Sequence, residues 1–171
     1  QSLTGDEEMK KVNIRTALPE DTPLIYDFIM KLAQYEKKEK EVKATPELLY
    51  ESLFVRRQAE VLMAFDDEQP IGFALYFHNF STFLGKANLY LEDLYVDEAY
   101  RHQGIGSQLF KRLAEIAVER NCERLDWWCL DWNASAITFY TQKLHAEPMH
   151  EWTVYRLCDK ALIQLAKEPL L

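Results

Sequence analysis

The chain has few of the residues that mark metal-binding or disulfide-rich proteins. Its three cysteines, Cys122, Cys129 and Cys158, contain no Cys-x-x-Cys pair and form an odd set, so neither a zinc site nor a disulfide framework is indicated. The four histidines also lack the spacing of metal ligands. We therefore expect no metal site.

Long apolar runs are absent too. The uncharged stretches are far shorter than a membrane span, and the N-terminal residues lack the pattern of a signal peptide. Residues 1–9 are polar and acidic, and we interpret them as a tag remnant or a disordered N-terminus. The remaining length and apolar content predict a single cytoplasmic domain over residues 10–171, with no membrane partner.

Positive charge is in short supply. The chain carries 20 lysines and arginines against 28 aspartates and glutamates, a formal net charge of −8. A nucleic-acid partner would require a basic face that replaces counterions, so this class of partner is not expected. The acidic balance is compatible with a cationic substrate.

Hydrophobic periodicity predicts alternating strands and helices. Helices are expected to begin after Asp21, at Thr45, near Ile105 and at Asn133, and the charged stretch 37–43 is expected to be a loop or a solvated helix end. Strands are predicted over residues 12–15, 61–65, 71–77, 89–96, 124–130 and 153–158. This order, without repeats or heptads, fits an α/β domain with a mixed sheet but leaves the strand arrangement open.

Residues 101–107 lie between a predicted strand and a strongly periodic helix. Gly104 and Gly106 allow a ligand to approach the backbone, and the first N–H groups of a helix have no internal partners. Together they could hold a pyrophosphate at the positive end of the helix dipole, with Arg101 adding a positive charge. A glycine pair alone also suits a tight turn, and this one is neither a Rossmann fingerprint nor a P-loop.

The flanking motifs extend this interpretation. Arg-x-x-Gly-x-Gly at residues 101–106 resembles the coenzyme A signature of the GNAT acetyltransferase superfamily, and residues 131–133 with 139–140 resemble its second conserved region. Residues 32–36 (LAQYE) and 90–94 (YLEDL) resemble the spermidine/spermine (diamine) acetyltransferase branch. The resemblance covers about residues 12–165.

The resemblance implies a GNAT fold: a twisted mixed sheet of six or seven strands, flanked by about four helices and splayed at the cofactor cleft. It also implies acetyl-CoA as co-substrate and a homodimer. The residues it assigns to the cofactor are Leu94, Tyr95, Val96, Arg101, His102, Gln103, Gly104, Ile105, Gly106, Ser107, Asn133 and Lys143. A backbone N–H near Leu94 would stabilise the oxyanion, and residues 94–96 would pair with the pantetheine amides like an added strand.

Acetyl transfer needs a neutral amine, although an alkylamine with a pKa of about 10.4 is almost fully protonated at pH 7. A carboxylate can bind the ammonium and accept its proton, directly or through water. In the resembled branch this is the glutamate of the Leu-Glu-Asp motif, here Glu92, while Asp93 helps to bind the substrate. Neighbours on a strand point to opposite faces, so only one of the two faces the thioester unless a bulge intervenes. The alternative is a pair of solvated carboxylates.

The leaving thiolate needs a proton donor. Tyr140 follows Asn133 on a predicted helix, and the resemblance makes it that donor, whereas an isolated tyrosine would more commonly be a packing residue. The residues that the resemblance assigns to the acceptor amine are Tyr35, Glu36, Phe83, Glu92, Asp93, Glu151 and Trp152. His145 stands where relatives often have a helix-ending glycine, a position that histidine tolerates.

These features predict an N-acetyltransferase for a primary amine of a small cationic metabolite, either a diamine or polyamine or a lysine-like amine. Two alternatives stay open. One is an acetyltransferase for protein lysines or N-termini, which would need an open, shallow acceptor groove. The other is a noncatalytic acyl-CoA-binding regulatory module, which would need neither Glu92 nor Tyr140.

Overall fold

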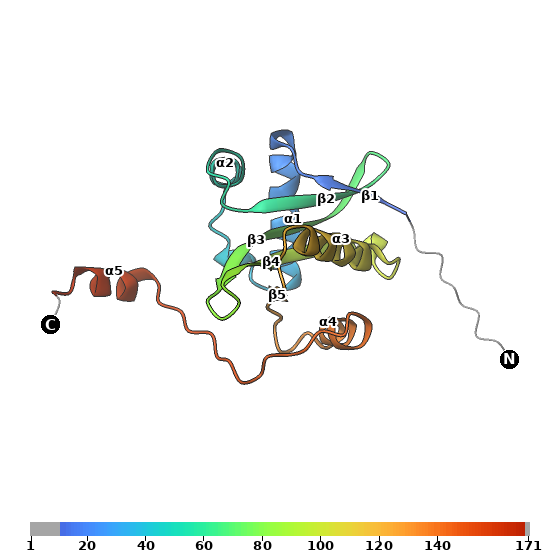
Figure 1. Cartoon of the computed structure of the whole chain (residues 1–171). Coiled ribbons are helices and arrows are strands. Elements are labelled where there is room, and N and C mark those ends of the chain that lie inside the picture. Colours follow the sequence, from blue (N-terminus) through green and yellow to red (C-terminus); the bar gives the residue numbers. More distant parts are fainter. Residues whose placement is uncertain (1–10, 170–171) are drawn as a thin grey trace. The chain divides into compact units, whose positions relative to one another are not determined.

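The structure is a computed structural model that describes residues 11–169 (Figure 1). The predicted tag remnant, residues 1–9, lies outside the described residues. The described chain groups into two compact units, one reaching Trp128 and one beginning at Cys129.

The first unit contains one mixed sheet, as predicted. Its strands follow the order β1-β2-β3-β4-β5, with antiparallel pairing up to β4 and a parallel β4–β5 pair (Figure 1). The bounds are β1 Asn13–Thr16, β2 Glu60–Asp66, β3 Gln69–Ser81, β4 Lys86–Val96 and β5 Leu125–Trp127.

The sheet has five strands in the described residues, fewer than the expected six or seven. The strand predicted over residues 124–130 shortens to β5, and the strand predicted over 153–158 is wrong, because those residues form irregular backbone in the second unit. Sequence alternation favours extended backbone, but a strand also needs a hydrogen-bonding neighbour, which no local pattern can supply.

The helices begin close to the predicted positions. They are α1 Thr22–Tyr35, α2 Pro46–Tyr50, α3 Ile105–Glu119, α4 Ala134–Thr138 and α5 Asp159–Lys167, and α2 and α4 each continue as a π-helical turn, over Glu51–Val55 and Phe139–Lys143. Thr45 caps α2 by accepting from the Leu48 N–H at 3.1 Å. Helix α5 was not predicted, although apolar residues three and four positions apart (Ala161, Leu162, Leu165) are typical of a helix.

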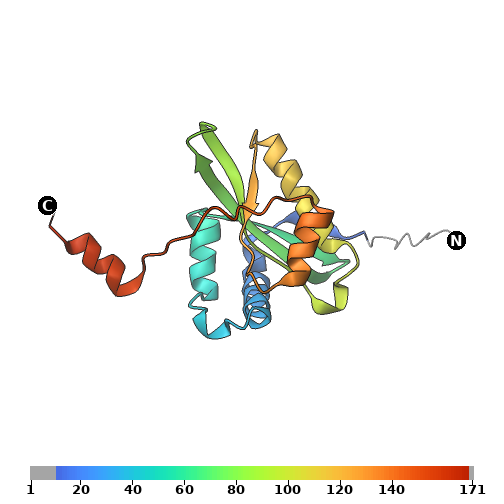
Figure 2. The ribbon, with the colours of Figure 1, turned by 90° about the horizontal axis from the view of Figure 1, so that it is seen from below.

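Helices cover both faces of the sheet (Figures 1 and 2). On one face, Phe28 of α1 stacks on Phe73 of β3 with ring centroids 5.6 Å apart and lies 6.1 Å from the Tyr95 ring of β4. On the other face, Phe110 of α3 packs against Trp127 of β5, with centroids 5.0 Å apart. We call these the α1 face and the α3 face.

A bulge in β4 changes which side chains share a face. Leu75 of β3 pairs with Asp93, whereas its neighbour Tyr76 pairs with Leu91, so Glu92 is an extra residue without a partner residue on β3. Because of this extra residue, the β4 side chains before the bulge point to the opposite face from the one that strict alternation from Asp93 would give. Leu91 is buried with Tyr76, while Asp93 shares the α1 face with Leu75.

A glycine lets β3 and β4 approach closely next to the end of β4. Gly72 pairs with Val96, and a Cβ atom on Gly72 would lie 2.7 Å from the carbonyl oxygen of Tyr95. No side chain fits at this distance, so the close approach requires glycine. It fixes the strand end from which the glycine-containing loop departs.

Candidate functional site

The loop of residues 101–104 and the first turn of α3 form an anion-binding cradle. Gly104 is the residue before the helix, with a φ of 79°, and His102 also has a positive φ of 62°. The first backbone hydrogen bond of the helix joins Gln108 N to Gly104 O at 3.1 Å, so the N–H groups of the preceding helical residues have no partner within the helix. A Cβ on Gly106 would meet no atom within 4 Å, so the space beside these N–H groups is open.

Arg101 braces this cradle. Its Nε donates to the Val96 carbonyl at 3.1 Å, and its guanidinium carbon lies 5.0 Å from the Tyr35 ring and 5.4 Å from the Tyr95 ring. The predicted positive charge therefore lies against two aromatic rings, where it joins the loop to the sheet and to the end of α1. Gln103 adds a hydrogen bond to the Ala99 carbonyl at 3.2 Å.

The last part of β4 leaves one backbone edge open. Strand β5 pairs with β4 only at Leu89, Tyr90 and Leu91, and within residues 11–169 no strand continues this pairing beyond Leu91. Residues 94–96, which the sequence assigned to the cofactor, lie on this part of β4, while the Tyr95 side chain is buried in the core. An extended amide-containing ligand could add to this edge as a strand does.

Three carboxylates converge where α1 ends against β4. Burial, together with the charges of Glu92 and Glu36, raises the pKa of Asp93 to about 7. Burial also raises the pKa of Glu36. Lys38 lowers this pKa to a smaller extent, and the charge of Glu92 adds a smaller rise. Glu92 itself is exposed on the bulge. The sequence had predicted all three residues, and the structure brings them together.

Aromatic side chains that the sequence did not single out lie beside these carboxylates. The Tyr90 ring centroid is 5.0 Å from that of Phe77 and 6.1 Å from that of Trp128. Burial raises the pKa of Tyr90 above its ordinary range, and the charges of Glu92, Asp126 and Asp93 add to this effect. Only the bulge and the β4–β5 register reveal this neighbourhood.

Phe83 does not join this group. It lies in the turn between β3 and β4, its side chain is 98% exposed, and the hairpin projects from the sheet (Figure 2). Six residues of β4 separate the start of the strand from Glu92, a distance of about 20 Å at the usual rise of a strand. Within the first unit, Phe83 is thus remote from Glu36, Glu92 and Asp93.

The second unit carries the remaining predicted residues. Asn133 caps α4, its side chain accepting from the Ala136 N–H at 3.4 Å, and Tyr140 lies half-buried in the following π-helical turn with its ring centroid 5.8 Å from that of Phe139. His145 ends this helical segment with a φ of 59°, as its tolerance of this conformation predicted. Lys143, Glu151 and Trp152 are exposed.

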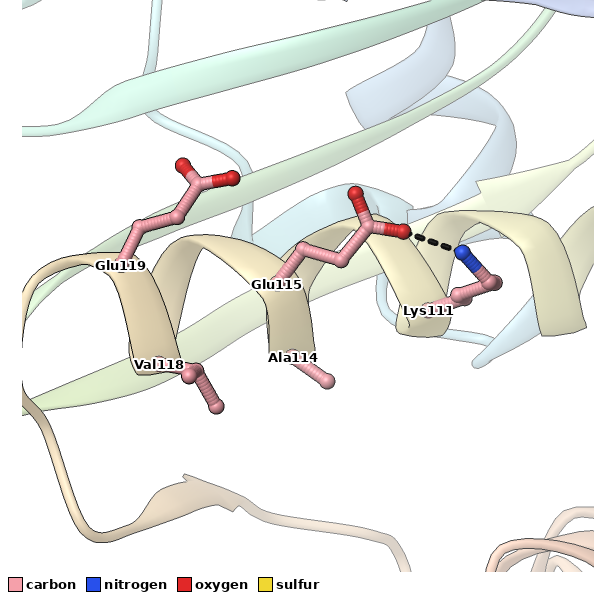
Figure 3. A pocket seen from close by; sticks show the side chains of 5 residues that line it. All are labelled: Lys111, Ala114, Glu115, Val118 and Glu119. Carbon is pink, nitrogen blue, oxygen red and sulfur yellow. Dashed lines mark hydrogen bonds and ion pairs between the residues drawn. The ribbon is translucent and has the colours of Figure 1, made fainter.

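A shallow pocket lies on α3, and none of its lining residues is a predicted site residue. It is lined by Lys111, Ala114, Glu115, Val118 and Glu119 (Figure 3). Lys111 bonds to Glu115 in this pocket, and Arg112 bonds to Glu115 and Glu119 at 3.2 Å each. Lys111 and Arg112 are therefore both paired with carboxylates of the same helix.

Residues 11–169 lack the features of two other kinds of site. No helix in this range is long and apolar enough to cross a membrane. The same range contains no group of three or more His, Cys, Asp or Glu side chains that could hold a metal ion.

Comparison with known proteins gives a consistent result. The sequence model of the acetyltransferase (GNAT) family matches residues 24–146. A thialysine N-epsilon-acetyltransferase of Bos taurus is 37% identical over 170 residues, covering 92% of this chain and 99% of its own. An L-ornithine N5-acetyltransferase of Arabidopsis thaliana is 38% identical over 102 residues, covering 60% of this chain and 44% of its own.

A solved structure extends the comparison to the fold. The integron cassette protein from the mobile metagenome of V. cholerae superposes with a TM-score of 0.77 at 30% sequence identity, covering 93% of this chain and 99% of that chain. The predicted α/β fold class is thereby confirmed, with the difference in strand number described above.

Proposed function

From the premise that this chain belongs to the GNAT acetyltransferase family and is an N-acetyltransferase acting on amines, we propose that it transfers the acetyl group of acetyl-CoA to a primary amine of a small cationic metabolite. The acceptor is a diamine, a polyamine or a lysine-like amine. The relatives named for thialysine and L-ornithine support an acceptor of this size and charge.

One observation carries this proposal: Glu36, Glu92 and Asp93 converge beside β4, on the strand that leads into the anion-binding cradle. Burial raises the pKa of Asp93 most, and the neighbouring charges of Glu92 and Glu36 raise it further, so three ionised carboxylates at this place are unfavourable. An ammonium group relieves this repulsion, so the cluster favours a cation over a neutral ligand.

The cradle fits the cofactor that the family uses. The unpaired N–H groups of Ile105, Gly106 and Ser107 would bind the pyrophosphate of coenzyme A, and the open edge of residues 94–96 would pair with its pantetheine amides. When bound, acetyl-CoA supplies the activated acetyl group as a thioester.

Each proton in the transfer has a proposed carrier. Asp93 and Glu36 hold the ammonium, and Glu92 accepts its proton, directly or through water, so that the neutral nitrogen attacks the thioester carbon. A backbone N–H near Leu94, close to the bulge at Glu92, stabilises the oxyanion. Tyr140 then protonates the departing sulfur, and it regains a proton, directly or through water, from the nitrogen, which loses its second proton as the amide forms. Direct attack needs no covalent enzyme intermediate, because holding the two reactants in contact supplies much of the rate.

We also propose that the two compact units act as one acetyltransferase domain, since the family match at residues 24–146 runs across the boundary after Trp128. We also propose a homodimer, the assembly that the resemblance to the family implies. Light scattering after size exclusion is expected to give twice the chain mass, whereas a monomer would contradict this proposal.

A panel of amines tests the activity. With acetyl-CoA, thiol release is expected with spermidine, putrescine, lysine or thialysine and is expected to be much slower with a lysine-containing peptide. Turnover of the peptide alone would transfer the assignment to protein acetylation. Binding of acetyl-CoA without turnover of any amine would favour the noncatalytic module.

Gly106→Leu tests the cofactor cradle. Because a Cβ at this position meets no atom within 4 Å and leucine favours helical backbone over glycine, we expect the ligand-free variant to melt at or above the wild-type temperature. The leucine fills the space beside the helix N–H groups, so saturating acetyl-CoA should no longer raise the melting temperature. Gly106→Ala is the matched control and should keep most of the stabilisation. Equal stabilisation of the leucine variant and the wild type would contradict the assignment.

A further inference from the structure

We propose that Phe77, Tyr90, Trp128 and Asp126 form a distal subsite that binds the methylene chain and the second ammonium group of the acceptor, so that the enzyme selects amines carrying two cationic groups. This inference rests on the proposed function, because the carboxylate cluster at Asp93 must hold the nitrogen that is acetylated.

The strand register places Phe77, Tyr90 and Asp126 on the α1 face, and Trp128 joins them through its ring contact with Tyr90. Phe77 lies two residues after Leu75, which packs against the core on that face, and Phe77 pairs with Tyr90. Tyr90 pairs in turn with Asp126 of β5, and paired residues share a face. Without the bulge at Glu92, simple alternation would put Leu91 on the face of Asp93 and Tyr90 on the opposite face.

The three rings form a continuous aromatic surface. Phe77 and Tyr90 are 5.0 Å apart and tilted by 41°, and Trp128 meets Tyr90 edge-on at 6.1 Å and 83°. Trp128 is 60% exposed, so a ligand can reach this surface. Exposed aromatic rings bind both methylene chains and cations, through apolar contact and through attraction to the ring face.

Asp126 gives this surface a charge at a suitable distance from the carboxylate cluster. Asp93 pairs with Leu75 of β3, and Tyr90 pairs with Phe77, two residues further along β3, so Tyr90 and its partner Asp126 lie about 7 Å from Asp93 along the strand direction. Across the sheet, β5 lies about 4.8 Å from β4. Asp93 and Asp126 are therefore about 8 to 9 Å apart at the backbone, a spacing similar to the extended length of 1,5-diaminopentane. The charges of both aspartates act on Tyr90, which lies between them.

Asp126→Asn provides the test in the full-length chain. Wild-type enzyme is expected to prefer 1,5-diaminopentane to 1-aminopentane by about tenfold or more in kcat/KM, because only the diamine has a second ammonium for Asp126. The variant should raise the KM of the diamine about five- to tenfold and leave that of the monoamine nearly unchanged. Asp67→Asn, in the exposed turn between β2 and β3, is the matched control and should keep the wild-type preference.

Two further arms complete the test. Trp128→Leu should raise the KM of both amines, because it removes contact with the shared methylene chain. Comparing kcat/KM for L-lysine with kcat/KM for 1,5-diaminopentane shows whether the enzyme prefers an amino acid or a diamine as the source of the second ammonium. Asp126→Asn should raise the KM of both substrates. Amine turnover with an unchanged diamine preference in Asp126→Asn would overturn the distal subsite alone, whereas no turnover of any amine by the wild type would overturn the proposed function as well.

Discussion

Replacing Tyr140 with phenylalanine is expected to lower turnover by about 100-fold or more, with little change in acetyl-CoA binding. The hydroxyl is the proposed proton donor to the leaving thiolate, and phenylalanine keeps the ring that packs beside Phe139. Steady-state rates with a diamine, together with the thermal shift that acetyl-CoA produces, measure the two effects separately.

Tyr155→Phe is the matched control for this variant. Tyr155 lies in the same compact unit, is 91% exposed and has no proposed role in proton transfer, so its variant should turn over at close to the wild-type rate. Wild-type turnover in Tyr140→Phe would instead make Tyr140 a packing residue.

Replacing Asp93 with asparagine is expected to stabilise the free protein at pH 8 while lowering its activity. The pKa of Asp93 is about 7 in the folded protein and about 4 in an unfolded chain, so the folded state retains a proton that the unfolded state releases between these values. Wild-type stability therefore falls as pH rises through this window, and above pH 7 the ionised carboxylate costs about 2 to 4 kcal/mol. Asparagine removes this cost without changing the shape of the side chain.

Thermal melts at pH 4.5 and pH 8 measure the effect. The variant should melt about 5 to 10 °C above the wild type at pH 8 and close to it at pH 4.5. Its kcat/KM for a diamine should fall by about tenfold or more, because an ammonium loses a half-buried charged partner. Glu92→Gln is the comparison: Glu92 is exposed, so a smaller gain in stability is expected, with a larger loss of turnover at neutral pH. Equal melting temperatures of Asp93→Asn and wild type at pH 8 would contradict the raised pKa of Asp93.

Short-range patterns determined much of this fold. Helices were predicted to begin at Thr45 and Asn133, and both side chains cap these helices by accepting from N–H groups only three residues away. Gly104 was predicted in a turn before a helix, and it has the positive φ that glycine permits. The motifs around Glu92 and residues 101–106 also indicated the family, because their chemistry depends on neighbours in the sequence.

Long-range pairing decided the rest. The sequence showed that Glu92 and Asp93 could serve one site only with a bulge, but the bulge arises from the register between β3 and β4, which involves residues far apart in the chain. The same register decided that Phe83 is remote from the carboxylates and that Tyr90, Asp126 and Trp128 lie beside them. Residues 153–158 have the alternation of a strand, yet they form irregular backbone in the second unit. The sequence by itself therefore determined the family and the local chemistry of its motifs, and only the tertiary structure decided which side chains share a face, because hydrogen bonding between strands selects among registers that local propensity leaves equivalent.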